Sequence, residues 1–427
     1  MIDITAFSDV AVLVGIALGY FFVFRLFSGS VKVHEFDDFG FVNLIMSFSM
    51  AVTDYACYLG IMPESAFFET NINVGAFYAA VFYFGKTLNV RGYVFNNSKK
   101  YRDLFYSYPN IIFFWQFLFV IFLLSALFFS YLQVVTGLSP EDRIVFAKNF
   151  RIVDIFRTGS ANILLPLAAL HFVIFKSRKS LFLIVAFALI SSMNGSKSFV
   201  LIIGSAFFVA RGLYRGYSSF VSDIKSAAIV AIPVSASVIF VIFFYTGDFD
   251  EAVYGLVRRV FYAGDVFLYA YIFTDYHNLF DLYDPITYLL HPFLRLFGFQ
   301  GYELPVGAAL ASNAFGLTNG TGPNANLSVV ALVLMRGDVW LSAIFCACGG
   351  ALVAGTKYAS SRILLQERLP AIWRLVASLV LFPSAWLLID IGTWEQVFIT
   401  VGLVFGLTTF IFEFLGGNYF KNAKENS

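Results

Sequence analysis

The chain has 427 residues and a formal net charge of +1; 59% of its residues are hydrophobic and only 13% are charged. Soluble domains carry about 25% charged residues, so a chain this apolar could not shield its surface from water and is not a soluble globular protein. The near-neutral charge gives no global field that would attract a nucleic acid. We therefore expect the lipid bilayer to be the solvent.

The apolar runs are about 20 residues long and lack alternation, so they predict helices rather than a barrel of strands. The expected fold is an all-α, polytopic integral membrane protein, in which residues 1–427 form a single transmembrane domain. Eleven spans are predicted, at about 7–25, 41–61, 72–90, 110–132, 160–175, 180–194, 198–212, 227–245, 338–356, 373–390 and 395–415.

Basic residues in short loops indicate the cytoplasmic face. With eleven spans, five basic groups fall on one face, which places the N-terminus outside and the C-terminus inside. Two segments, about 133–159 and about 246–337, then lie outside and are long enough to fold. The five groups are Arg91 to Arg102, Lys176 to Lys179, Arg211 to Lys225, Lys357 to Arg374, and Lys421 with Lys424.

Two parts of the second outer segment need a separate interpretation. Residues 252–273 are apolar enough to span, apart from three charged residues, but a span there would force the basic residues of 357–374 outside. We expect instead an external helix that lies along the membrane or dips into it. Residues 326–335 are too short to cross and predict a re-entrant or surface half-helix that ends at Arg336.

Charges beside a membrane are costly and need a reason. The outer segments carry several cations, and the arginine fork binds phosphate oxygens in pairs. A lipid diphosphate is the expected ligand, although neutralisation of outer headgroups or local carboxylates would explain the same residues. The expected diphosphate-binding residues are Arg157, Lys197, Arg258 and Arg259, with Arg295 as a further substrate contact.

Polar residues between 251 and 273 recur at steps of three and four, which places them on one helical face. This face would line a sugar-phosphate groove and include Tyr262; a polar face turned to water is the alternative. A group that deprotonates a sugar hydroxyl needs a pKa near neutrality. Asp265 is the expected base, with His291 in reserve, and a structural role is open for both.

Residues 307–326 are rich in glycine, small residues and amides, so several backbone N–H groups can point at one ligand there. Asn324 is an expected substrate contact in this run. Pro323 is expected to start a half-helix whose N-terminus favours an anion, while a flexible outer loop is the alternative. No cofactor is expected, because the sequence shows neither metal-ligand spacing nor a nucleotide fingerprint.

Three features together resemble the O-antigen polymerase family of oligosaccharide repeat-unit polymerases. The first is Asn-Gly-Ser-Lys-Ser at 194–198, which is similar to the family's Gly-Ser-Arg-Ser, with Lys197 where Arg is usual. The second is the large outer loop with Arg258 and Arg259. The third is Thr321-Gly322-Pro323, which leads into an apolar segment and a Gly-rich span at 338–356.

The resemblance implies a GT-C-type glycosyltransferase of the bacterial inner membrane that polymerises undecaprenyl-diphosphate-linked repeat units at the periplasmic face. The implied partners are a lipid-linked glycan donor and acceptor, with no nucleic acid, and the resemblance leaves room for a chain-length regulator in the membrane. An O-antigen ligase, which transfers finished glycan to a lipid core, shares this architecture. A polysaccharide or lipid transporter is a more distant alternative, which inverted repeats with broken helices would favour. A non-enzymatic scaffold is a third, which the outer arginines disfavour.

Overall fold

The computed structural model describes residues 7–96, 98–107, 110–136, 150–193, 199–215, 265–273, 276–296, 304–315 and 325–416, with short pieces of 228–250 and residues 299 and 302. Every regular element in these ranges is a helix, which confirms the all-α expectation. The helices form two packed groups with separate hydrophobic cores.

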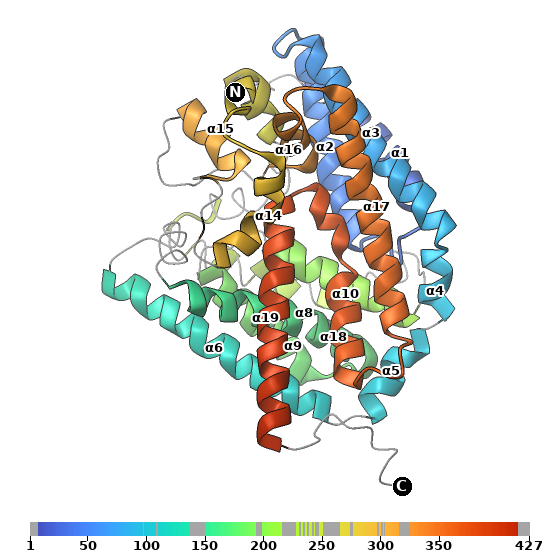
Figure 1. Ribbon diagram of the computed structural model, residues 1–427, viewed down its shortest axis with the longest axis vertical. Helices are drawn as coiled ribbons and strands as arrows, with labels where there is room; N and C mark the ends of the chain where they lie inside the picture. The colour runs from blue at the N-terminus through green and yellow to red at the C-terminus, as the bar shows by residue number, and fades with distance from the viewer. Residues whose placement is uncertain are drawn as a thin grey trace.

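The first group consists of α1, α2, α3 and α17, which lie side by side (Figure 1). Gly350 of α17 allows α3 to approach closely, because a Cβ atom there would lie 2.3 Å from the carbonyl oxygen of Phe77. Small residues permit this kind of contact between membrane helices. The bounds are α1 Phe7–Ser28, α2 Asp38–Tyr58, α3 Glu64–Thr87 and α17 Val339–Ile363.

The second group surrounds α8, which packs against α6, α10 and α19. Gly159 of α8 has the same role as Gly350, since a Cβ atom there would lie 2.5 Å from the carbonyl oxygen of Thr400 in α19. The bounds are α6 Asn110–Thr136, α8 Arg151–Phe175, α9 Arg178–Met193, α10 Phe199–Arg215, α18 Ala371–Leu381 and α19 Ile391–Gly416. η5 Ser384–Leu388 lies between α18 and α19 in the chain, and its buried residues belong to the core of the first group.

Short helices cover the two ends of the molecule. In Figure 1, α15 and α16 lie at one end, and α4 and α5 lie towards the opposite end. The first end holds α13 Asp265–Leu268, η3 Tyr269–Phe273, η4 Tyr276–Leu279, α15 Val306–Phe315 and α16 Leu327–Leu334, whereas α14 Pro285–Leu296 packs against α19, nearer the middle of the molecule. The second end holds α4 Val90–Asn96 and α5 Ser98–Ser107.

The structure supports a membrane protein, although with fewer clear spans than predicted. Among the described residues, four helices are long and apolar enough to cross a bilayer: α1, α6, α8 and α17. The predicted count of eleven is therefore not reached. Most other predicted spans coincide with helices that are shorter or more polar, and about 227–245 lies largely outside the described residues.

Parts of three of the five predicted basic groups lie near one another at one end of the bundle. α4 and α5, which carry the first basic group, pack against α17 and α10, and the Arg362 guanidinium lies over the ring of Tyr93 at 5.5 Å. The assignment of this end to the cytoplasm stays a prediction. We call the opposite end the outer end.

One predicted span and one predicted loop residue are wrong. The segment 373–390 is not one helix: α18 ends at Leu381 and η5 follows after Pro383, which cannot donate a backbone hydrogen bond. Lys357 does not lie in a basic loop, because α17 continues past it and its side chain is fully buried.

Lys357 stabilises the break between α18 and η5. Its ammonium group donates to both carboxylate oxygens of Asp38, at 2.7 and 2.8 Å, and to the carbonyl oxygen of Phe382 at 2.8 Å. Asp38 in turn accepts the N–H of Ala385 at 3.0 Å. The ion pair thus adds hydrogen bonds to backbone groups at the interruption, where the Phe382 carbonyl oxygen also accepts the N–H of Ser384 at 2.8 Å.

Candidate functional site

A carboxylate surrounded by aromatic side chains lies at the outer end. The hydroxyl groups of Tyr271 and Tyr276 both donate to Glu69 Oε2, at 2.6 and 3.1 Å. Neither uses Oε1, and Glu69 is half-buried. The exposed ring of His277 stacks on Tyr276 with centroids 4.3 Å apart. We call these four residues the Glu69 cluster.

Three separate elements position the Glu69 cluster. Glu69 stands in the second turn of α3, Tyr271 lies in η3, and Tyr276 and His277 lie in η4. η3 is a π-helix, an uncommon element that occurs frequently at functional sites. The turn before α17 lies close by, because a Cβ atom on Gly337 would come within 3.1 Å of Phe280 and 3.7 Å of His277 Nε2. The φ of +76° at Gly337 is one that residues with side chains rarely adopt.

The surroundings of Tyr271 keep its hydroxyl group protonated. Burial and the Glu69 carboxylate raise the pKa of the Tyr271 phenol well above its ordinary value, so the phenol remains a donor at neutral pH. Glu69 can therefore accept a further hydrogen bond on Oε1, from a hydroxyl group for example. A carboxylate beside aromatic rings is a chemistry that suits sugars, whose hydroxyl groups donate and whose C–H faces stack.

Glu69, Tyr271 and Tyr276 were not predicted from the sequence. A charged residue near the start of an apolar run was the only signal for Glu69. Its tyrosine partners lie 202 and 207 positions further along the chain, so only the fold brings these side chains together.

The half-helix expected at 326–335 is confirmed as α16. All eight of its residues are buried, so it lies inside the helix bundle and not on the surface of the protein. It begins at Leu327, after the N-cap Asn326, and not at Pro323. It runs antiparallel to α17, because the Ser342 hydroxyl lies 3.2 Å from the carbonyl oxygen of Ala331, whereas Cys346 Sγ lies 3.9 Å from that of Leu327.

Of the four expected diphosphate-binding residues, Arg157 is the one that lies within the described part of the chain. It lies in the second turn of α8, not in the loop predicted at 133–159. Its guanidinium donates to Asp154 at 2.6 Å and lies 4.7 Å from the ring centre of Phe129. Its Nε atom is buried and has no partner among the described residues. A substrate phosphate would therefore have to compete with Asp154.

His291, the expected reserve base, belongs to a different cluster. It lies in α14, is 7% exposed, and stacks on Tyr302 with centroids 3.8 Å apart. Tyr302 stacks in turn on Tyr288. This packing is typical of a structural histidine, which is the alternative that the sequence left open.

The remaining expected contacts cannot be placed by their side chains. Asp265 starts α13 and Arg295 lies in α14, but only their backbone is described. Lys197, Arg258, Arg259, Tyr262 and Asn324 lie outside the described residues. Among the residues that the structure does describe, no group of three or more His, Cys, Asp or Glu side chains could hold a metal ion.

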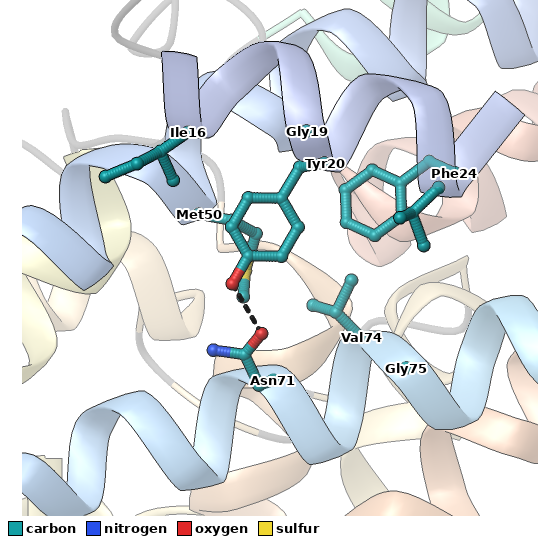
Figure 2. A pocket seen from close by; sticks show the side chains of 9 residues that line it. Ile16, Gly19, Tyr20, Phe24, Met50, Asn71, Val74 and Gly75 are labelled. Carbon is teal, nitrogen blue, oxygen red and sulfur yellow. Dashed lines mark hydrogen bonds between the residues drawn. The ribbon is translucent and has the colours of Figure 1, made fainter. Parts of the chain in front are cut away.

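An apolar cavity of about 400 Å³ lies between α1, α2 and α3. Figure 2 shows Tyr20 of α1 pointing across it towards Asn71 of α3, with Met50 of α2 behind. The Tyr20 hydroxyl lies 2.6 Å from Asn71 Oδ1 and 2.5 Å from Asp54 Oδ2. A Cβ atom on Gly19 or Gly75 would meet nothing within 4 Å. The cavity therefore extends over these two positions because glycine has no side chain to fill it.

Comparison of the chain with protein-family models, curated proteins and solved structures finds no match. The case for a function therefore depends on the residues and geometry described above.

Proposed function

We propose that the chain polymerises undecaprenyl-diphosphate-linked oligosaccharide repeat units into a surface polysaccharide, such as an O-antigen, a capsule or an exopolysaccharide. It acts at the periplasmic face of the bacterial inner membrane as a glycosyltransferase that needs neither metal nor nucleotide. A polytopic, GT-C-like topology is part of this proposal. The observation that carries it is the Glu69 cluster, a carboxylate and aromatic site for sugar at the predicted outer end.

The chemistry follows from these groups. A hydroxyl group of the acceptor sugar attacks the anomeric carbon of the donor glycan, and the bond from that carbon to the lipid diphosphate breaks. Glu69 or His277 takes the hydroxyl proton, in addition to the predicted candidates Asp265 and His291. Cations among the outer residues stabilise the charge of the departing diphosphate, so the leaving group does not have to be protonated.

Reconstitution tests this function. The purified chain in proteoliposomes, supplied with a synthetic undecaprenyl-diphosphate oligosaccharide, should give a ladder of products on a gel. Glu69→Gln should reduce chain extension by about a hundredfold or more, the lower range for loss of a general base. Glu64→Gln is the matched control, because Glu64 lies exposed in the first turn of the same helix. A full ladder from Glu69→Gln would remove Glu69 from the mechanism.

The predicted diphosphate contacts have their own test. Arg258→Ala and Arg259→Ala should leave single-unit products while the protein still inserts into the membrane. Normal long polymers from both variants would remove these two residues from the site. Transfer of glycan to a lipid core without a ladder would favour the ligase.

A transporter is the second candidate, because the structure contains an interrupted helix at 373–390, which the sequence did not reveal, beside the half-helix α16. The half-helix α16 and η5, which follows the interruption, meet beside Gly349, where a Cβ atom would lie 2.6 Å from Leu327 and 3.2 Å from Leu387. Transporters often bind their substrates at discontinuous helices. Movement of lipid-linked sugar across the bilayer without any ladder would favour this function.

A further inference from the structure

We propose that the N-terminus of α16 is an oxyanion site that binds the phosphoryl oxygens of a phosphate or diphosphate. The first two N–H groups of the helix, on Leu327 and Ser328, have no intrahelical acceptor. The helix dipole adds partial positive charge at this end. α16 has eight residues and is buried along its whole length, so water does not freely supply the missing acceptors.

Unpartnered polar side chains at the same place point to a ligand. Asn326 is 1% exposed, and its Oδ1 accepts the N–H of Val329 at 3.0 Å, but its Nδ2 has no partner among the described residues. The Ser328 hydroxyl is 0% exposed and also lacks a partner there. Buried donors without acceptors are rare in proteins and usually mark an unseen water, ion or ligand.

A third such side chain stands on α3. Asn73 is fully buried, and neither its Nδ2 nor its Oδ1 has a partner among the described residues. It lies one turn before Phe77, which contacts Gly350 of α17. Because α3 and α17 pack side by side and both start at the outer end, Asn73 lies at about the same level as Cys346, one turn before Gly350. The Cys346 Sγ atom lies 3.9 Å from the carbonyl oxygen of Leu327, the first residue of α16, and α16 also packs against α3.

The donors outnumber the acceptors in this layer, which is why an oxyanion fits better than a cation or a neutral hydroxyl. Two backbone N–H groups, two amide NH₂ groups and one hydroxyl can donate, whereas Asn73 Oδ1 is the unpartnered amide acceptor. The site lies about 10 Å from the outer end of α17, given the helical rise to Cys346. A lipid diphosphate can reach this depth, so identifying the ligand as a lipid rests on the proposed function.

Binding to the purified full chain in nanodiscs tests the site. One arm uses soluble inorganic diphosphate, and the other uses nanodiscs that contain undecaprenyl phosphate. Asn326→Asp is the informative variant, because its carboxylate still caps Val329 but replaces the NH₂ donor with a negative oxygen. It should weaken binding at least about tenfold, as expected for loss of a hydrogen bond to a charged group.

Ser328→Ala should weaken binding in the same way. Ser205→Ala is the matched control, because Ser205 also carries a buried hydroxyl without a described partner but lies in α10. Binding in the lipid arm supports a lipid source, and binding only of soluble diphosphate supports the site with a free anion. No binding in either arm, or wild-type binding by Asn326→Asp, overturns the proposal. If the site holds only a water molecule, neither probe binds and Ser328→Ala is more stable than the parent chain, which also overturns the proposal.

The site and the function can fail separately. If Asn326→Asp loses diphosphate binding while the parent chain makes no ladder, the site stands and the polymerase proposal falls. If the parent makes a ladder and Asn326→Asp makes the same one and binds diphosphate normally, the oxyanion site falls and the polymerase proposal stands.

Discussion

Removal of the Lys357 ammonium group should destabilise the chain more than any change of a surface charge. Lys357→Met keeps most of the volume of the side chain, but it removes the ammonium donor, so that Asp38 and Phe382 keep only the backbone N–H groups of Ala385 and Ser384. Both members of the ion pair are 0% exposed. Breaking a fully buried pair costs about 3–5 kcal/mol, because one charge stays behind without compensation.

A double-mutant cycle separates the pair from its surroundings. Asp38→Asn keeps an oxygen that can accept the N–H of Ala385, and should alone cost about 3 kcal/mol. The double variant should cost little more than either single one, with an interaction energy of about 3 kcal/mol, the upper range for residues in contact. Unfolding in mixed micelles, followed by the fluorescence of Trp386 in η5 and the other tryptophans, measures these losses.

Lys86→Met is the control for this cycle. Lys86 is exposed on α3, where its ammonium lies 4.2 Å from the ring centre of Phe82, so its loss should cost about 1 kcal/mol or less. If Lys357→Met unfolds like the parent, or if the two single losses simply add, the ion pair does not hold the helix break.

Two further predictions concern packing and pH. Gly350→Ala should cost about 1–3 kcal/mol, because the new Cβ atom would lie 2.3 Å from the Phe77 carbonyl oxygen, whereas Gly355→Ala, with nothing within 4 Å, should be neutral or stabilising in the same unfolding assay. Burial raises the pKa of Glu35, but hydrogen bonds from Arg25 and a neighbouring lysine outweigh burial and leave the pKa below its ordinary 4.5. Glu35 therefore contributes stability above pH 4.5 that is lost as the pH falls through its folded pKa. Melting curves of Glu35→Gln should show a weaker loss of stability in this acid window, and an unchanged pH profile would contradict the assignment.

Local signals in the sequence were sufficient for some of the structure. The half-helix at 326–335 could be predicted because it is too short to cross a bilayer and ends at the turn with Gly337. Length and hydropathy likewise predicted α1 and α6 close to their observed bounds and the start of α17, although α17 ends seven residues later than predicted. These elements depend on residues that are close together in the chain.

Other features depend on tertiary contacts and escaped the sequence. The partners Asp38 and Lys357 lie 319 positions apart, so Lys357 looked like a loop cation. Pro383 does indicate an interruption of the segment 373–390. The apolar composition of that segment nevertheless led to the prediction of one continuous span. The Glu69 cluster likewise exists only because η3 and η4 fold back onto α3.

Sidedness tests the central claim most directly, because the proposed polymerisation requires the Glu69 cluster to lie on the outer face of the membrane. After the three native cysteines are replaced by alanine, Asp281→Cys reports the outer end and Lys99→Cys the basic end. A membrane-impermeant maleimide should label Asp281→Cys in right-side-out vesicles and Lys99→Cys only in inverted ones. If Asp281→Cys reacts only in inverted vesicles, the Glu69 cluster faces the cytoplasm and the proposed function is wrong.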